Sequence, residues 1–407
     1  MTARLKIWHI GGDSAVDCVN GVNTIVWSVA RSQAAAGHAV TVIVPSAPNE
    51  ITETMARAEH LTLFVAPRSK WPVLGELRRL LATEQPDIVH MHSVFIPQHA
   101  ALAKALAAAG IPYIVTSHGG LSAVVMKRGK LKKTIYGLLL EKPRFMRAAA
   151  LTVSNPLEVD DVRGYVPGYR GPIQFVFNSV EVGAPRTMNS ATSAEPGRKN
   201  IVFLGRLDVL HKGIDRLVEI ARHHPEADYR LYGAEDAKTK PWLDSLKQNQ
   251  PANLSFHAPV FGDDKRKVLS NADLYIQPSR WEGFPLAVAE AMALGVPCAI
   301  SETLGMTELF RENELALILE KDPVRAAGGI RRLLADRPAL AALGERCHAF
   351  ALAHFRLSVV AETYVDLYRR AIASKGKTSV TNSKRDLAGT VLADPNVPFR
   401  EGQNCVR

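Results

Sequence analysis

The chain has 407 residues, of which 47% are hydrophobic and 22% charged, and its formal net charge is +10. This is an ordinary globular composition, long enough for two domains with separate cores, and no run of about eighteen apolar residues indicates a membrane-spanning helix. The four cysteines lack paired spacing and a Cys-x-x-Cys motif, which argues against a disulfide framework or a zinc site and fits a reducing compartment.

Predicted strands and helices alternate along the first half of the chain. Runs of β-branched and apolar residues predict strands at residues 6–10, 38–44, 61–66, 88–92 and 113–117. Helices are predicted between them, and Gly37 offers the first one a left-handed cap; they span residues 24–36, 74–84 and 98–109. This alternation favours an α/β fold with a doubly wound parallel sheet and helices on both faces.

The second half of the chain repeats the pattern, with strands predicted at residues 200–204, 228–232, 253–257, 274–277 and 297–300. The segment 180–199 is rich in Ser, Pro, Ala, Gly and Asn, a composition that suits a linker. We therefore predict a first domain over residues 1–182 and a second over 183–374, which ends in a helix at 357–374. A polar segment at 375–407 is predicted to be a disordered tail.

Two glutamates near the end of a predicted buried strand are spaced as a ligand site requires. Glu282 lies on the loop after that strand, and Glu290 lies on a helix that Pro285 can start. A turn and about 1.5 turns of helix, on the order of 8 Å, separate them, which is roughly the distance from the ribose of a nucleotide to a sugar linked through its diphosphate. The helix start between them offers free N–H groups to phosphates. The alternative is one exposed loop glutamate and one salt-bridged helix glutamate.

A second junction of strand, loop and helix carries two cations and two glycines. Gly205 and Arg206 follow a predicted strand, and Lys212 and Gly213 open the next helix. Glycines allow close backbone approach and the cations supply positive charge, so this is a good setting for a diphosphate. Ordinary surface charges at Arg206 and Lys212 are the alternative.

Taken together, these segments resemble glycosyltransferase family 4, the retaining nucleotide-sugar transferases with two facing Rossmann-like domains. In the first half, the resemblance rests on a glycine loop with its helix, two strand ends and a turn near the domain junction, in the segments IWHIGGDSAVDCVNGVN, PDIVHMHS, PYIVTSHGGLS and FVFNSVEV. In the second half, it rests on a phosphate loop and a Glu-x7-Glu motif, in the segments FLGRLDVLHKGIDRL and ADLYIQPSRWEGFPLAVAEAMALG. The resemblance covers roughly residues 5 to 370.

This resemblance implies a nucleotide sugar bound mainly to the second domain, an acceptor bound to the first, and a final helix that crosses back onto the first domain. It implies that Glu290 binds the ribose and that Glu282 contacts the donor sugar. Arg206 and Lys212 would neutralise the leaving diphosphate, so the reaction would need no divalent metal and no other cofactor beside a UDP- or GDP-linked substrate. The implied catalytic residues are Arg206, Lys212, Glu282 and His118, and the implied donor-binding residues are Glu290, Gly205, Gly283, Phe284, Pro285, Leu286, Gly21 and Asn178.

Histidines and glycines at strand ends of the first half are further candidates. His118 follows a strand, where family members place a histidine beside the donor sugar; a satisfied core histidine is the alternative. His90 and His92 share one strand face and could ligate a metal, but the sequence shows no third ligand and no Asp-x-Asp motif. Gly21 is expected on the loop after the first strand, where backbone can approach phosphate or sugar closely, or as a structural turn.

The positive charge is concentrated between Lys127 and Lys133 and continues through Lys142, Arg144 and Arg147. It has no interleaved aromatic residues, which argues against nucleic-acid binding. A solvated face and a patch that faces anionic lipid headgroups are the two interpretations that remain. The start of the chain is too short and polar for a signal peptide, so we expect a cytoplasmic protein, peripheral on the inner face of the membrane if the patch binds lipid.

These observations predict a retaining hexosyltransferase that moves a sugar from a nucleotide diphosphate sugar to a saccharide or lipid-linked acceptor, in the synthesis of a cell-surface polysaccharide or glycolipid. Two alternatives remain open. One is a nucleotide-sugar epimerase of similar fold, which would use no acceptor. The other is a degenerate relative that binds a nucleotide sugar or a partner transferase. The donor sugar, the acceptor and the oligomeric state cannot be read from the residues.

Overall fold

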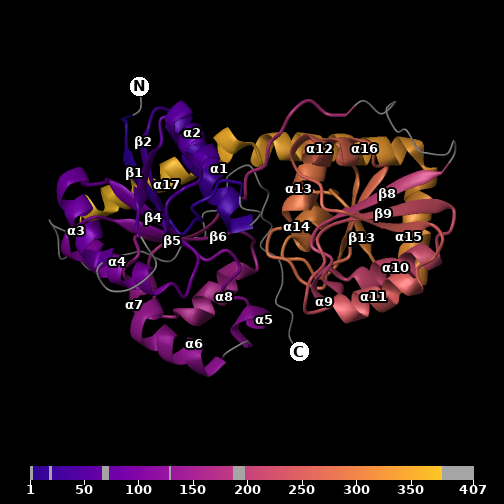
Figure 1. Ribbon diagram of the computed structural model, residues 1–407, viewed down its shortest axis with the longest axis horizontal. Coiled ribbons are helices and arrows are strands. Elements are labelled where there is room, and N and C mark those ends of the chain that lie inside the picture. Colours follow the sequence, from indigo (N-terminus) through magenta and orange to yellow (C-terminus); the bar gives the residue numbers. More distant parts are fainter. Residues whose placement is uncertain (1–2, 18–20, 67–72, 128–129, 187–197, 378–407) are drawn as a thin grey trace. The chain divides into compact units, whose positions relative to one another are not determined.

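The computed structural model describes residues 3–17, 21–66, 73–127, 130–186 and 198–377 (Figure 1). The chain divides into two compact units, one made of the residues up to Phe177 together with those from Val360, the other of Asn178–Val359. The first division comes a few residues before position 182, the predicted end of the first domain. Residues 187–197 of the predicted linker and residues 378–407 of the predicted tail lie outside the described part of the chain.

The first unit contains a seven-stranded parallel sheet in the order β3-β2-β1-β4-β5-β6-β7. Its strands are β1 (Lys6–Ile10), β2 (Ala39–Val44), β3 (Thr62–Val65), β4 (Ile88–His92), β5 (Tyr113–Thr116), β6 (Ala150–Val153) and β7 (Ile173–Phe175). The sequence predicted the first five of these within a residue or two. It missed β6 and β7, which are short and lie toward one edge of the sheet.

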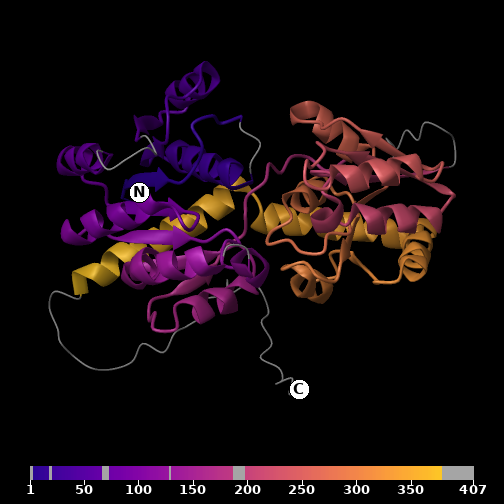
Figure 2. The same ribbon diagram turned by 60° about the horizontal axis from the view of Figure 1, so that its bottom comes forward.

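Helices cover both faces of this sheet (Figure 2). They are α1 (Gly21–Ala35), α2 (Glu50–Ala58), α3 (Val73–Glu84), α4 (Pro97–Ala108), α5 (Ala123–Lys127), α6 (Lys130–Tyr136), the π-helix η1 (Gly137–Glu141), α7 (Lys142–Arg147), α8 (Glu158–Tyr165) and α17 (Leu357–Lys377). One face packs Trp8, Met91 and Val115 against α3, α4, α7 and α8. The other packs Ile7 and Ile114 against α1 and against the buried tyrosines of α17.

The second unit contains a six-stranded parallel sheet in the order β10-β9-β8-β11-β12-β13. Its strands are β8 (Lys199–Leu204), β9 (Ala227–Tyr232), β10 (Leu254–His257), β11 (Leu274–Gln277), β12 (Cys298–Ser301) and β13 (Leu317–Leu319). Its helices are α9 (Val209–Lys212), α10 (Ile214–Arg222), α11 (Lys240–Gln248), α12 (Gly262–Ser270), α13 (Leu286–Ala293), α14 (Thr307–Glu312), α15 (Pro323–Ala335) and α16 (Arg337–His354). Two parallel-sheet α/β units confirm the predicted fold class.

Each sheet has a point where the strand order reverses, and that point selects the loops able to bind a ligand. In the first sheet it lies between β1 and β4, and in the second between β8 and β11. Ligands of open α/β sheets bind outside the carboxyl ends of the strands at such points. The loops after β8 and β11 are the two segments that carry Arg206, Lys212 and Glu282, and the loop region after β1 and β4 adjoins His92.

The basic segment of the sequence lies on α5, α6, η1 and α7, but not all of it is on the surface. Arg144 is fully buried and forms an ion pair of 2.5 Å with the equally buried Glu141. It also donates to the Ser93 carbonyl oxygen at 2.9 Å. The prediction that Arg144 extends the basic surface was therefore wrong, because its charge is neutralised inside the unit. No helix within the described ranges combines the length and the apolar character that crossing a bilayer requires.

Candidate active site

The loops after β8 and β11 meet in an ion pair between two residues that the sequence placed in separate motifs. Lys212 Nζ lies 2.5 Å from Glu282 Oε1, and the two side chains are only 18% and 11% exposed. Ser279 Oγ donates a second hydrogen bond to Glu282 Oε1 at 3.0 Å. The carboxylate is thus held in one orientation at the reversal point of the second sheet.

A glycine allows these two loops to approach so closely. Gly213 has a φ of +68°, in the left-handed region, and a Cβ at this position would lie 2.3 Å from the Pro278 carbonyl oxygen. The loops are also joined by the Arg280 backbone N–H, which donates to the His211 carbonyl oxygen at 2.9 Å, and by a two-point ion pair of Arg280 with Asp215. Only a residue without a side chain fits at this contact.

Buried polar side chains behind Glu282 support it from the strand below. Tyr275 OH lies 2.6 Å from Gln277 Oε1, Gln277 Nε2 donates to Ser279 Oγ at 2.6 Å, and Ser279 continues to Glu282. The sequence predicted this strand only as an apolar run. The available signal was the polar residue at every second position at its end, because such residues point to the same face of a strand.

Arg206 and Lys212 do not share partners, although the sequence treated them as a pair. Arg206 is 53% exposed and forms ion pairs with Asp236 at 3.0 Å and with Asp208 at 3.6 Å. The Lys212 side chain instead passes Gly205, where a Cβ would lie 3.8 Å from Lys212 Cε. Gly205, Lys212 and Glu282 therefore form one cluster, and Arg206 lies on the surface with carboxylates of its own.

Glu290 lies on α13 and has a cationic partner that the sequence did not show. Its Oε1 is 2.5 Å from Nζ of Lys265 on α12. Burial raises the pKa of Glu290, and the lysine acts in the opposite direction. This is the salt-bridged helix glutamate of the alternative interpretation. Among the contacts described for Glu290, Lys265 is the only cation. A ribose or phosphate bound at Glu290 would therefore lie beside Lys265.

The residues between the two glutamates shape the start of α13. Pro285 is buried and precedes the helix as its N-cap, and Leu286 is the first helical residue. The expectation that Pro285 occupies the first helical position was therefore off by one residue. Phe284 packs edge-to-face on Phe355, with ring centroids 5.5 Å apart, while Gly283 is partly exposed. This segment offers its backbone groups near Glu282 and uses its aromatic side chain for packing.

In the first unit, His118 lies on a tight turn held by a buried glutamate. His118 has a φ of +50° and Gly119 one of +73°. Glu158 on α8 accepts from Ser117 Oγ at 2.6 Å and from the Gly119 backbone N–H at 2.5 Å, and its other oxygen accepts from Ser154. Sequence reasoning missed Glu158, because only the fold brings α8 next to this turn.

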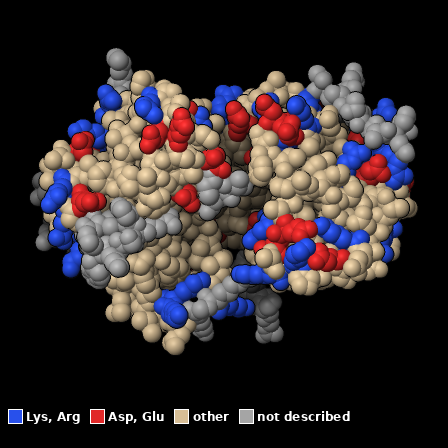
Figure 3. Space-filling model, in the orientation of Figure 1, with Lys and Arg blue, Asp and Glu red and all other residues tan. Residues whose placement is uncertain are grey.

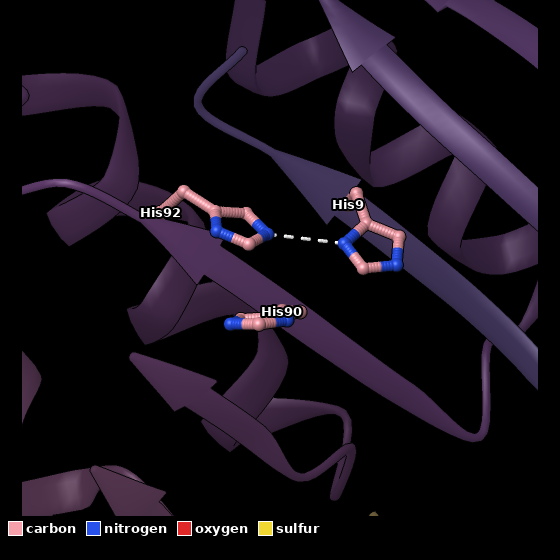
Figure 4. Close-up of side chains that lie close together, drawn as sticks. All are labelled: His9, His90 and His92. Carbon is pink, nitrogen blue, oxygen red and sulfur yellow. Dashed lines mark hydrogen bonds between the residues drawn. The ribbon is translucent and has the colours of Figure 1, made fainter. Parts of the chain in front are cut away.

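His118 also contacts a cluster of buried histidines through His92. Figure 4 shows the three rings of that cluster, His9, His90 and His92. His9, His90 and His92 have ring nitrogens within 4.8 Å of one another, so His9 supplies the third imidazole that the sequence did not show. Each ring nitrogen of the three nevertheless has a hydrogen-bond partner in the protein. Burial lowers the pKa of His9 and of His118 to about 4, and those of His90 and His92 well below the usual value. The donor set therefore fits neutral, hydrogen-bonded rings better than a bound cation.

Gly21 and Asn178 are the last two predicted donor-binding residues. Gly21 is exposed and is the first residue of α1, so the expectation that it lies on the loop was wrong. Asn178 is the first residue of the second unit and is buried, and its Oδ1 has no hydrogen-bond partner among the described residues. That oxygen is an acceptor left for a ligand or a water molecule.

Comparison with known proteins decides the family. A profile described as glycosyl transferases group 1 matches residues 186–349, and one described as a glycosyl transferase 4-like domain matches residues 20–178. This chain belongs to the family 4 glycosyltransferases. The first profile covers the second unit's loops with Lys212, Glu282 and Glu290, and the second covers the turn of His118.

Relatives and solved structures agree with this assignment. An uncharacterised glycosyltransferase of Methanocaldococcus jannaschii is 30% identical over 34% of this chain and 36% of its own length. A putative teichuronic acid biosynthesis glycosyltransferase of Bacillus subtilis is 25% identical over 61% of each chain, so the chain spans less than two thirds of these two relatives. Sucrose-phosphate synthase from Thermosynechococcus elongatus has the same fold, with a TM-score of 0.70 and 21% identity over 91% of this chain and 100% of its own. Anabaena HepE in complex with UDP-glucose matches with a TM-score of 0.69 and 15% identity, over 90% of this chain and 100% of its own.

Proposed function

We propose that this glycosyltransferase is a metal-independent, retaining hexosyltransferase that uses a UDP- or GDP-linked sugar and a saccharide or lipid-linked acceptor. The observation that carries the proposal is the ion pair between Lys212 and Glu282 at the reversal point of the second sheet. An oriented carboxylate for sugar hydroxyls and a cation for phosphate lie together there. The complexes of HepE with UDP and with UDP-glucose support a nucleotide-sugar donor.

The proposed reaction breaks the bond between the anomeric carbon and the diphosphate, and forms a bond from that carbon to the acceptor oxygen on the same face. Negative charge develops on the departing diphosphate, where Lys212 and Arg206 stabilise it without a metal. The leaving phosphate takes the proton of the acceptor hydroxyl. Glu290 would bind the ribose, Glu282 a donor-sugar hydroxyl and His118 a second hydroxyl, with main-chain contacts from Gly283 to Leu286 and further contacts from Gly205, Gly21 and Asn178.

A set of purified variants tests this proposal. Lys212→Ala and Arg206→Ala are expected to lower turnover of a nucleotide sugar by about 100-fold or more, the usual cost of one charge stabiliser. Arg311→Ala, which removes an exposed ion pair with Glu308 on the same unit, is the matched control and should keep full activity. Near-normal turnover in both site variants would refute the assignment. Activity should also survive EDTA, and a loss that magnesium restores would overturn the metal-free mechanism.

The product separates the two alternatives. Transfer to an added acceptor supports the transferase. Release of an epimerised sugar without an acceptor would support an epimerase. Tight binding of nucleotide sugars with neither product nor donor hydrolysis would support a binding protein. A thermal-shift screen of nucleotide sugars identifies the donor first, since a ligand at a hundredfold excess over its Kd stabilises the folded state by about 2.7 kcal/mol.

The surface of α6 and η1 supports a lipid-linked acceptor and a peripheral position on the inner face of the membrane. Leu131, Ile135, Leu138 and Leu139 are 75%, 52%, 59% and 70% exposed. Their spacing places them along one side of the helix, and a solvent-facing apolar stripe of this kind is typical of interaction with another surface. Figure 3 shows Lys and Arg beside a surface without charged residues at the end of the unit where Figure 1 places α6. An apolar stripe beside cations is the pattern of helices that lie in the membrane interface.

Sedimentation with lipid vesicles tests this part of the proposal. We expect binding to anionic vesicles at low salt that weakens at high salt, because charges are screened beyond about 8 Å at physiological ionic strength. Replacing Leu138 and Leu139 by Ser should weaken vesicle binding at every salt concentration. Replacing the exposed Lys132 by Ser should mainly reduce the salt dependence of vesicle binding. Absence of binding at low salt would leave a solvated face and favour a soluble acceptor.

A further inference from the structure

A chain of hydrogen bonds runs from His118 into the core of the first unit. His118 Nε2 lies 3.1 Å from His92 Nδ1, and His92 Nε2 lies 3.1 Å from His9 Nδ1. His9 Nε2 lies 2.8 Å from Gln33 Oε1, which ends the chain on α1. Figure 4 shows the central link, with the rings of His9 and His92 pointing toward one another. His9 and His92 therefore each use both ring nitrogens in the chain, whereas His118 uses only Nε2.

The last acceptor determines which nitrogen of every ring carries a proton. A neutral imidazole has one donor and one acceptor nitrogen, and an amide oxygen can only accept. His9 must therefore carry its proton on Nε2 to donate to Gln33, which leaves Nδ1 to accept from His92. His92 must in turn carry its proton on Nε2 and accept on Nδ1 from His118. His118 then has its proton on Nε2 and a lone pair on Nδ1, which has no partner among the described residues.

A second set of contacts accommodates the amide of Gln33 in this orientation. Its Nε2 donates to Tyr368 OH at 3.4 Å, and Tyr368 OH lies 2.7 Å from His90 Nδ1. The phenol can accept from the amide and donate to His90, whose Nε2 lies 2.6 Å from Thr116 Oγ1. A reversed amide would turn every bond of the chain around and move the His118 proton to Nδ1. The orientation of one buried side chain thus sets the tautomer of the outermost histidine.

We propose that Gln33, His9 and His92 are positioning residues that keep His118 in the Nε2–H tautomer and present its Nδ1 as an acceptor for a ligand hydroxyl. That the hydroxyl belongs to a sugar rests on the proposed function. A fixed acceptor selects a ligand that carries a hydroxyl at this point, because an analogue without it leaves the lone pair of His118 unsatisfied. The chain thereby couples a residue on α1 to ligand specificity at the end of β5.

Nitrogen-15 NMR of the protein labelled at histidine tests the proposal without any substrate. Long-range proton–nitrogen spectra distinguish the two tautomers, and His118 is expected as Nε2–H in the wild type. Gln33→Leu removes the terminal acceptor and should yield a mixture of tautomers. His224→Phe is the matched control, because it removes a buried, hydrogen-bonded histidine of the second unit that is not part of the hydrogen-bonded chain, and it should leave the His118 tautomer unchanged.

Three results would overturn the proposal. One is His118 with its proton on Nδ1 in the wild type, and another is an unchanged tautomer in Gln33→Leu. The third is a shift of the His9 and His92 nitrogens to metal-bound values on addition of Zn²⁺, which would show a metal centre. With UDP-glucose as the probe, Gln33→Leu should lower kcat/KM roughly five- to tenfold, the contribution of about one hydrogen bond, and leave UDP binding unchanged. Absence of transfer from every UDP- and GDP-linked sugar tried with the wild type would refute the proposed function but not the tautomer assignment.

Discussion

The ion pair of Lys212 and Glu282 makes a quantitative prediction about stability as well as catalysis. Replacing Lys212 by Met removes the cation 2.5 Å from a carboxylate that is only 11% exposed. At an effective dielectric constant of about 20, two unit charges at this distance attract each other by roughly 7 kcal/mol. Each ion also loses several kcal/mol of favourable hydration when the pair forms, and this cost offsets most of the attraction. What remains in Lys212→Met is a poorly compensated charge, with the Ser279 hydroxyl at 3.0 Å and His211 Nε2 at 3.9 Å.

We therefore expect Lys212→Met to destabilise the second unit by about 3 kcal/mol, near the lower end of the range for breaking a buried pair. Adding Glu282→Gln should recover about 2 kcal/mol of this, because a neutral amide does not need a cation. Hydrogen exchange of the amides in β8 and β11 gives the free energy of opening for wild type, both single variants and the double variant. Effects of the two substitutions that add within about 0.5 kcal/mol would show that the pair is not coupled and would refute the reasoning.

Three further predictions concern binding, backbone geometry and pH. Glu290→Gln should weaken calorimetric binding of bare UDP or GDP as well as of the sugar nucleotide, whereas Glu282→Gln should weaken only the latter; equal losses on the bare nucleotide would contradict the assignment. Gly213→Ala should destabilise the second unit by more than about 1 kcal/mol in urea unfolding, since its left-handed φ and blocked Cβ position exclude a side chain, whereas Gly164→Ala on the open face of α8 should be neutral or stabilising. Burial lowers the pKa of His9 to about 4 in the folded protein, whereas an exposed histidine titrates near 6.5. The unfolded chain therefore takes up a proton first as the pH falls. The free energy of unfolding should be unaffected by His9 above pH 6.5 and should decrease by about 3 kcal/mol as the pH falls toward 4. His9→Phe should flatten the stability profile over that window, and an unchanged slope would show that the ring is not held neutral.

The strand and helix pattern was predictable where local composition alone determines an element. Lys6–Ile10 and Ile88–His92 are short segments rich in large apolar residues, in parallel strands that are buried apart from Lys6, and the prediction matched them residue for residue. The short strand Ile173–Phe175 was missed, since three residues between loops carry too little pattern to detect. Gly21 was expected on the loop after the first strand, where glycine allows close backbone approach to a ligand, but it is the first residue of α1.

The candidate site shows the same division between local and long-range information. Glu282, Glu290, Lys212 and Arg206 were identifiable, because each stands in a motif whose residue types and spacing are contiguous in the chain. Their partners were not identifiable, because each partner comes from another segment. Lys265 reaches Glu290 from a helix 25 positions away, and Glu158 reaches the turn of His118 across 39 positions. Spacing along a chain does not encode such distances.

The sequence by itself determined the alternation of strands and helices, the fold class and the residues that we propose bind a nucleotide sugar. Those properties follow from periodicity and from side-chain chemistry, which are written in neighbouring residues. Only the tertiary structure decided that Lys212 pairs with Glu282, that Arg144 is buried, and that His118 is the end of a hydrogen-bonded chain. Each of these depends on parallel strands and their loops being brought side by side by packing, and a one-dimensional pattern does not specify which groups then come within hydrogen-bonding distance.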